Sequence, residues 1–244
     1  MAAVAEPNTL SLDLRDIADA KAGPMLFSAA QRLGLGQKIV LQIDRDPQSL
    51  LRATAFQLRD AISWSVSDAG GVWQAEVRPR KEAEARDVVD LLTWDHYRLD
   101  RQFADVLAAA NANRVAEAES IFQDYWIGLR RHVHMENFIL GPVLGGGEKK
   151  GPLADMLFEH DSIIQQSRLV DETFLEKDYA MLPAICAVLS GSLAKHENRE
   201  ENTLFPIWQA ANNQDKLRAE ELLMQTKALL GGADDAIVKE RFPD

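Results

Sequence analysis

One pattern occurs twice in the chain, as His132-Val-His-Met-Glu-Asn-Phe-Ile-Leu-Gly-Pro142 and as His196-Glu-Asn-Arg-Glu-Glu-Asn-Thr-Leu-Phe-Pro206. In both stretches a glutamate comes one helical turn after the first histidine, and a Leu-x-Pro segment then terminates the pattern. On a helix, His-x3-Glu places the imidazole and the carboxylate roughly 40° apart around the axis. The repeat predicts two helices that each present one such pair, an arrangement typical of two-metal carboxylate sites in four-helix bundles.

From about Asp87 onward, apolar residues recur with the period of an α-helix. Four long stripes are expected, over residues 87–112, over 115–144, from Leu153 and from about Tyr179, separated by short or glycine-rich breaks. An amphipathic segment, Asp215 to Leu230, follows. These patterns predict an all-α, up-down four-helix bundle over residues 87–212, with an extra C-terminal helix and tail in residues 213–244.

Each of the four stripes contains one histidine: His96, His132, His160 and His196. A single histidine on an apolar face is usually a core residue with one hydrogen-bond partner, but one in every helix is a poor fit to coincidence. Glu136 and Glu200 lie on the same stripes, and burying a carboxylate without a counter-charge costs several kcal/mol. A pair of cations in the bundle core accounts for all six residues, which are therefore the predicted metal ligands.

Several other side chains near the predicted site are not expected to bind the metal themselves. His134 lies about 160° around the helix from His132 and is expected to face solvent or the helix boundary. Metal-bound histidines usually donate their outer N–H group to a hydrogen-bond acceptor. The candidates for hydrogen bonds around the site are Asp100, Tyr125, Trp126 and Ser192, although ordinary packing or surface exposure is the simpler interpretation of each.

The first eighty residues alternate between strand and helix patterns. Strands are expected at Leu10–Leu14, Lys38–Ile43, Ala61–Val66 and Val72–Val77, and helices at Met25–Leu33 and Pro47–Gln57. Asp68-Ala-Gly-Gly71 predicts a hairpin between the last two strands. The order β-α-β-α-β-β predicts a small α+β domain over residues 1–80, in which both helices cover one face of a mixed sheet.

Composition narrows the function classes. The net charge of −11 resides entirely in residues 81–244, because nine basic and nine acidic side chains balance in residues 1–80. An acidic protein of this kind is not expected to bind nucleic acid. The single cysteine, Cys186, permits no internal disulfide and suits a reducing compartment. Neither a secretory signal in Met1–Leu10 nor a membrane span is apparent, so a cytoplasmic location and no membrane partner are expected.

The His and Glu pattern over about Asp87 to Ala211 resembles the hemerythrin family and its broader His-His-Glu cation-binding domains. The resemblance implies a four-His, two-Glu ligand set: His96, His132 with Glu136, His160, and His196 with Glu200. It also implies two iron ions that share both glutamates and an oxo or hydroxo bridge, with about five ligands each and one open position. Manganese or zinc would also suit these donors.

Two departures from oxygen-carrying hemerythrins are visible. Their fifth ligand histidine corresponds to Ile164 here, and their last carboxylate corresponds to Glu201 rather than Glu200. With its repeated His-x3-Glu spacing, the ligand set looks closer to that of the repair-of-iron-centres proteins. These members of the family are implicated in nitric oxide stress. Glu200 is the ligand indicated by the helical period, with Glu201 as the alternative.

The N-terminal segment resembles the small TusA-like or SirA-like fold, in a variant often fused to hemerythrin domains. The likeness rests on Leu12-Asp-Leu-Arg15, Asp44-Arg-Asp-Pro47 and the hairpin with Trp64 and Trp73. Sulfur-transfer members of that fold use a cysteine after the first strand, but Arg15 to Lys21 contains none. A sulfur-transfer role is therefore not expected, and a structural accessory role is as plausible as sensing or docking.

Three functions remain for the whole chain. The first is a binding or sensing protein that captures nitric oxide or oxygen during nitrosative or oxidative stress. The second is a di-iron oxidoreductase, or an iron donor, acting on nitric oxide, peroxide or damaged iron–sulfur clusters. This role requires an electron-donor protein, because the sequence has no flavin or nicotinamide fingerprint. The third is a structural module in which the metal only holds the helices together. The first is favoured, and an enzyme is the alternative.

Overall fold

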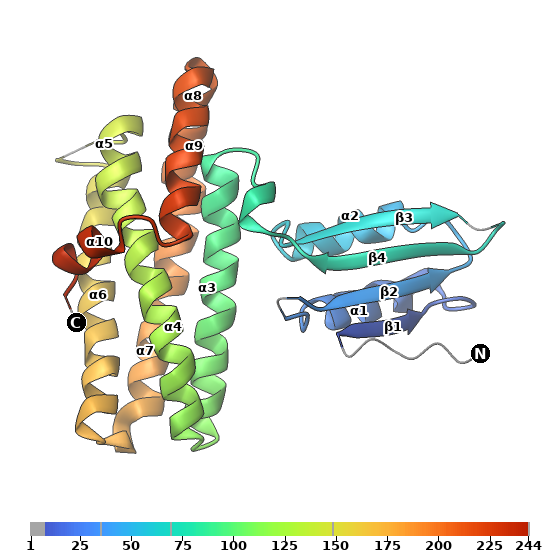
Figure 1. The fold of residues 1–244 in the computed structure, drawn as a ribbon, viewed down its shortest axis with the longest axis horizontal. Coiled ribbons are helices and arrows are strands. Elements are labelled where there is room, and N and C mark those ends of the chain that lie inside the picture. The colour runs from blue at the N-terminus through green and yellow to red at the C-terminus, as the bar shows by residue number, and fades with distance from the viewer. Residues whose placement is uncertain (1–7, 35, 69, 148, 244) are drawn as a thin grey trace. The chain divides into compact units, whose positions relative to one another are not determined.

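A computed structural model describes residues 8–34, 36–68, 70–147 and 149–243, and the chain divides into two compact units, Met1–Glu84 and Ala85–Asp244. The first is a small α/β domain with a four-stranded sheet, and the second is helical (Figure 1). Among the described residues, no helix is both long and apolar enough to cross a membrane.

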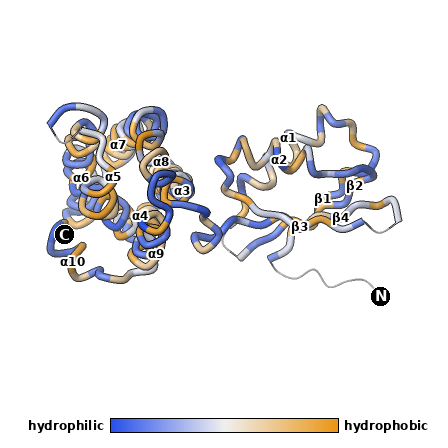
Figure 2. Tube along the Cα trace, turned by 90° about the horizontal axis from the view of Figure 1, so that it is seen from above, coloured by the Kyte–Doolittle hydropathy of each residue, from blue (hydrophilic) through white to orange (hydrophobic). Residues whose placement is uncertain are grey.

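The first unit has the element order expected from its sequence. Its elements are β1 (Thr9–Asp13), α1 (Asp19–Ala30), β2 (Lys38–Ile43), α2 (Gln48–Gln57), β3 (Ile62–Asp68), β4 (Trp73–Pro79) and the single turn η1 (Glu82–Glu84). The sheet order is β1-β2-β4-β3, with β1 parallel to β2 and the other pairs antiparallel. Both helices lie on one face of this mixed sheet, as predicted (Figures 1 and 2).

Alternation along β2 explains which face of the sheet is covered. Ile39, Leu41 and Ile43 are buried, whereas the residues between them are only half-buried. Their partners on β4 include the buried Val77 and Ala75, so one continuous apolar face packs against the helices. The predicted hairpin is present: Asp68 pairs with Trp73 and its side chain accepts a hydrogen bond from the Gly71 N–H at 3.0 Å. Ala69 of this turn and Leu35 lie outside the described residues.

The first helix begins earlier than expected, at Asp19 rather than Met25. Pro24 lies inside α1. Its missing N–H costs the helix one hydrogen bond. The buried Ala22 packs in the same layer as Leu26 and Ala30, so tertiary contact carries the helix through this segment.

The second unit contains the predicted bundle. Its four main helices are α3 (Val88–Asn111), α4 (Val115–His134), α6 (Pro152–Glu176) and α7 (Leu182–Arg199), which run up and down beside one another (Figure 1). Asp87 caps α3, because its side chain accepts a hydrogen bond from the Asp90 N–H at 2.9 Å. The core between the helices is one continuous cluster of buried apolar side chains that includes Phe103, Phe122, Trp126 and Leu189.

Shorter elements extend the bundle. They are the π-helical turn η2 (Met135–Leu140), α5 (Gly141–Leu144), η3 (Tyr179–Met181), the π-helical turn η4 (Glu200–Leu204), α8 (Phe205–Gln214), α9 (Lys216–Leu230) and α10 (Asp235–Arg241). The C-terminal segment packs on the bundle as predicted, through buried Leu222 and Leu229. No sequence pattern predicted α10, a short helix that lies against α4.

The helices continue through both Leu-x-Pro segments. The first runs on as α5 to Leu144, and the second runs on as α8 to Gln214. Each proline lacks an N–H and its ring crowds the carbonyl four residues earlier. The helix widens to a π turn instead: the Gly141 N–H donates to the Glu136 carbonyl, and the Phe205 N–H to the Glu200 carbonyl. Such π turns occur frequently at functional sites.

Candidate metal centre

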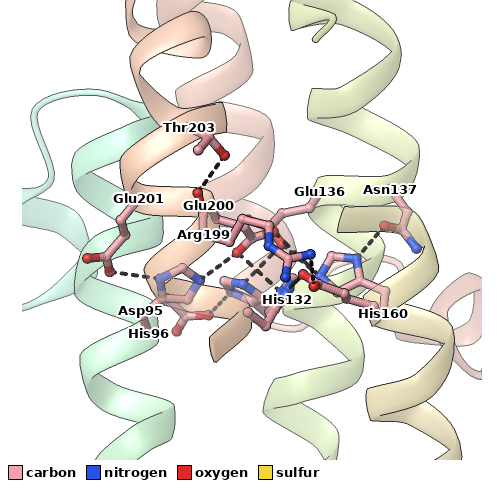
Figure 3. A network of polar contacts seen from close by, with 12 residues as sticks. Asp95, His96, His132, Glu136, Asn137, His160, Arg199, Glu200, Glu201 and Thr203 are labelled. Carbon is pink, nitrogen blue, oxygen red and sulfur yellow. Dashed lines mark hydrogen bonds and ion pairs between the residues drawn. The ribbon is translucent and has the colours of Figure 1, made fainter. Parts of the chain in front are cut away.

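All six predicted ligands converge in the core of the bundle, between the four main helices. Figure 3 shows His96, His132, Glu136, His160 and Glu200 gathered there. Their donor atoms form two overlapping groups in which every atom lies within 4.8 Å of the others. One group is His96, His132, Glu136 and Glu200, and the other is Glu136, His160, His196 and Glu200. Every one of these side chains is buried. The geometry therefore defines two adjacent positions, each with two imidazoles, that share both carboxylates.

The distances show how the carboxylates are shared. Oε2 of Glu136 lies 3.2 Å from Nε2 of His132 and 3.2 Å from Nε2 of His160. Oε2 of Glu200 lies 3.2 Å from Nε2 of His196 and 3.4 Å from Nε2 of His96. Each glutamate thus contacts one histidine of each position, as a bridging carboxylate would.

The atoms at the centre have no hydrogen-bond partner among the described residues. This holds for Nε2 of His96, His132 and His160 and for both carboxylate oxygens of Glu136 and Glu200. Leaving so many buried polar atoms unsatisfied is very costly unless something else binds them. Imidazole nitrogens and carboxylate oxygens are donors for divalent metals such as iron, manganese and zinc. The residues present therefore fit a pair of metal ions.

The outer ring nitrogen of each histidine is held by a different helix. Nδ1–H of His132 donates to Asp95 at 3.0 Å, and Nδ1–H of His196 donates to Glu159 at 3.1 Å. Likewise, Nδ1–H of His96 donates to Glu201 at 3.1 Å, and Nδ1–H of His160 donates to Asn137 at 2.6 Å (Figure 3). Because these acceptors fix the proton on Nδ1, all four Nε2 lone pairs point to the centre, ready to bind a metal.

Two of these acceptors are themselves held by arginines. Arg98 donates to Asp95 at 2.7 Å, and Arg199 forms an ion pair with Glu159. Each forms a chain of guanidinium, carboxylate and imidazole that ends at one metal position. Such a chain restricts the rotation of the imidazole and keeps the carboxylate ionised.

The site is built from an internal repeat. His160 follows His96 by 64 residues, and His196 follows His132 by the same distance, as Glu200 follows Glu136. The hydrogen-bond acceptors obey the same offset, with Glu159 corresponding to Asp95 and Glu201 to Asn137. The pair α3–α4 and the pair α6–α7 therefore supply equivalent halves of one centre.

The pKa values show what the centre requires in the absence of a cation. Burial opposes the charged form of His132, but Glu136 and Asp95 outweigh it and raise its pKa to about 9. Burial is likewise outweighed at His96, whose pKa is raised well above its usual value by Glu200 and Glu201. At His196, burial and the neighbouring His160 lower the pKa to about 2. Protons on some histidines thus balance the carboxylates where a metal would do so.

The carboxyl groups respond to the same surroundings. Burial opposes ionisation of Glu136, yet His132 and His160 hold its pKa well below the usual value. Burial and the charge of Glu136 raise the pKa of Glu200. Asp95 is also buried, but Arg98 and His132 lower its pKa to about 2, so it remains a carboxylate beside the metal position.

A small cavity adjoins the imidazoles. Every main helix contributes to its apolar wall, which consists of Leu99, Leu129, Val133, Ile163 and Leu193, and its polar lining includes Asp100, Tyr125 and Glu197. The volume of this cavity is about 10 Å³. That is room for one water molecule or a ligand of similar size. The hydroxyl of Tyr125 is fully buried and has no partner among the described residues.

Several expectations about surrounding residues need correction. His134 does not face solvent: its side chain is buried, with its ring 5.2 Å from that of Phe138, because α10 and Phe242 cover this part of α4. Ser192 does not support a histidine but donates to Gln166 at 2.9 Å. Trp126 packs in the core under Arg130 and does not line the cavity. Asp100 and Tyr125 do line it, although neither holds a ligand's outer nitrogen in any contact described above.

The four residues that do hold the outer nitrogens were missed. One signal was present in the sequence: Asp95 and Glu159 each precede a ligand histidine, and Asn137 and Glu201 each follow a ligand glutamate. One step along a helix rotates a side chain by about 100°, toward the neighbouring helix. Glu201, the alternative ligand, occupies this outer position, with its carboxylate against Nδ1 of His96. Ile164 and Met156 are buried apolar residues, and Cys186 is a buried thiol whose burial raises its pKa to about 11.

Comparison with known families agrees with this division of the chain. Residues 11–79 match the family described as "Uncharacterized conserved protein (DUF2249)". Residues 87–208 match the hemerythrin HHE cation-binding domain, and this match covers half of the chain's 244 residues. Neither a curated protein nor a solved structure matches the chain. The chain belongs to the hemerythrin HHE cation-binding domain family.

Proposed function

We propose that this protein binds two iron ions through His96, His132, Glu136, His160, His196 and Glu200, and uses them to capture nitric oxide or oxygen. The observation that carries the proposal is the set of buried, unpartnered donor atoms at the centre of the bundle. The family match supports cation binding. Four imidazoles and two carboxylates are a donor set that suits iron, with manganese or zinc as substitutes.

The cavity supports a small external ligand over a purely structural metal. A structural site is usually closed by protein ligands. Here the imidazoles and Tyr125 line a small cavity, and the Tyr125 hydroxyl has no partner among the described residues. Reduced iron held by these residues would offer a coordination position to a diatomic ligand, and Tyr125 would supply a hydrogen-bond donor at the cavity. Ile164 and Met156, the residues around the absent fifth histidine, are buried and apolar, which keeps competing donors away.

Handling or sensing of nitrosative or oxidative stress in the cytoplasm is the physiological role that we infer from this chemistry. A sustained reduction of nitric oxide or peroxide would need an external electron donor. The chain's single cysteine, Cys186, is not suited to supply electrons, because it is buried and its pKa is raised to about 11. We therefore favour capture over turnover, and no feature of the site favours iron donation.

The experiment is an anaerobic titration of the reduced, iron-loaded full-length protein with nitric oxide and then, separately, with oxygen. Near-ultraviolet and visible absorption would follow the iron. The proposal predicts a saturable response to nitric oxide in the wild type and its loss in Glu136→Ala. Glu220→Ala, which changes an exposed glutamate of α9, is the matched control and should respond as the wild type. If the iron-loaded protein responded to neither gas, the proposal of gas capture would be wrong. The remaining function would be a structural one, in which the metal only holds the helices together.

A further inference from the structure

We propose that the two metal positions are unequal, and that the position formed by His96 and His132 binds its metal more tightly than the position formed by His160 and His196. The inference rests on the proposed function, since it requires two metal ions. It concerns the order in which the positions fill and names Glu201 and Asn137 as the residues that set this order.

The internal repeat makes the comparison between the positions direct. The ligands themselves are identical in type at the offset of 64 residues, so they give no reason for a difference. The difference lies in what holds them. At the His96 position a carboxylate, Glu201, accepts the Nδ1 proton at 3.1 Å, whereas at the His160 position an amide oxygen, Asn137, accepts it at 2.6 Å.

The chemical type of the acceptor changes the strength of the ligand. A carboxylate draws the Nδ1 proton more strongly than a neutral amide does, and this makes Nε2 a better donor to the metal. Both histidines of the first position, His96 and His132, donate to carboxylates. In the second position only His196 does so. The first position thus has one more anionic hydrogen-bond acceptor than the second.

Burial of the remaining carboxylates acts in the same direction. The side chain of Asp95, which holds His132, is 0% exposed, whereas that of Glu159, which holds His196, is 19% exposed. The arginine partner of Glu159, Arg199, is 48% exposed. Charges that lie near solvent interact with a metal ion more weakly than buried charges do. Glu201 itself is 25% exposed, so its effect is attenuated but keeps its sign.

An aromatic ring adds a third contrast. Phe205 stacks on His96, with ring centroids 5.5 Å apart and planes inclined by 12°. The residue at the same place in the repeat is Gly141, which has no side chain to cover His160. A stacked ring restricts the imidazole to its binding orientation, and so lowers the conformational cost of holding a metal at the first position.

Stepwise metal binding tests the inference. Cobalt(II), whose visible absorption reports each binding step, would be titrated into the metal-free full-length protein in the presence of a competing chelator. We expect two steps whose affinities differ by about 10- to 100-fold, the usual effect of changing a hydrogen-bond partner of a metal ligand. Asn137→Asp should strengthen the weaker step and bring the two together. Glu201→Gln should weaken the tighter step.

The controls separate this inference from a general charge effect and from the proposed function. Asn213→Asp and Glu220→Gln make the same chemical changes at exposed sites outside the centre and should leave both steps unchanged. Two equal steps in the wild type would overturn the inference, as would variants that shift both steps equally. A wild type that binds fewer than two metal ions would instead overturn the proposed function.

Discussion

The two units of this protein treat charged side chains in opposite ways. In the sheet domain the charges are partly exposed and neutralise one another: Arg15 binds Asp13, and Arg45 binds Asp44 and Asp19. In the helical domain Glu136 and Glu200 are buried together, and their oxygens have no hydrogen-bond partner among the described residues. Among the described residues, the buried carboxylates of the helical domain thus carry an electrostatic cost that a bound cation would relieve, whereas the ion pairs named in the sheet domain do not.

The largest effect should come from removing a shared carboxylate. Glu136→Ala or Glu200→Ala removes a ligand common to both positions and should eliminate most bound metal, measured by elemental analysis after reconstitution and dialysis. Glu201→Ala should retain two metal ions at saturating metal, because Glu201 only contacts the outer nitrogen of His96. Asp13→Ala in the sheet domain should leave metal content unchanged. Loss of metal in Glu201→Ala alone, at saturating metal, would show that the ligand on this helix is assigned wrongly.

Removal of metal should separate the two units in a thermal melt. Only the folded helical domain offers the assembled site, so metal at about a thousand times its Kd should stabilise that domain by about 4 kcal/mol. Scanning calorimetry of the full chain, with and without metal, should show the helical transition move while the sheet transition stays in place. If metal shifted the melting temperatures of both transitions equally, metal binding would not be confined to the helical domain.

The stability of the metal-free protein should decline in mildly alkaline solution. The folded-state pKa of His132 is about 9 against an ordinary value of 6.5. Its contribution to stability is therefore complete below about pH 6.5 and is lost as the pH rises toward 9; His96 has the same sign. At about 1.4 kcal/mol per unit, the loss from His132 is at most about 3.5 kcal/mol. His196, whose folded pKa is lowered, affects stability only below about pH 6.5.

The measurement is chemical denaturation of the metal-free and metal-loaded forms at several pH values between 6.5 and 9. Metal replaces the protons on the histidines, so the loaded form should not show this decline and the gap between the two forms should widen with pH. A gap that narrows over this range would contradict the assignment of protons to His96 and His132.

The smallest effect concerns the cavity. Tyr125→Phe removes a hydroxyl that has no partner within the described structure, so the melting temperature of the metal-free protein should stay the same or rise slightly. Azide, a small anion that accepts hydrogen bonds, should bind the oxidised iron form about fivefold more weakly, as expected for the loss of about 1 kcal/mol. Tyr179→Phe, a tyrosine that does not line the cavity, is the control. If Tyr125→Phe left the azide affinity unchanged, the Tyr125 hydroxyl would not contact the bound ligand.

Features with a local period could be predicted from the sequence. The alternation in Lys38–Ile43 gave a strand with those bounds, and the stripe positions of the four histidines placed them on the inner face of the bundle. The up-down bundle follows from the same regularity, and its hemerythrin type was implied by the resemblance of the His and Glu pattern.

Features that depend on contacts between helices could not be predicted in this way. The acceptors Asp95, Asn137, Glu159 and Glu201 each act on a histidine of another helix, and helical periodicity does not tell which helices are neighbours. His134 was misplaced for the same reason, since the covering helix α10 comes from the far end of the chain. The π turns depend on how the chain accommodates Pro142 and Pro206 within packed helices.

Metal binding by the six buried donors is tested most directly by the metal content of the purified full-length protein after anaerobic reconstitution with ferrous iron and removal of excess metal. We expect two iron ions per chain in the wild type and almost none in the double variant Glu136→Ala/Glu200→Ala, with folded protein verified by circular dichroism. A wild type without stoichiometric metal, or a double variant that retains both ions, would contradict metal binding by these donors.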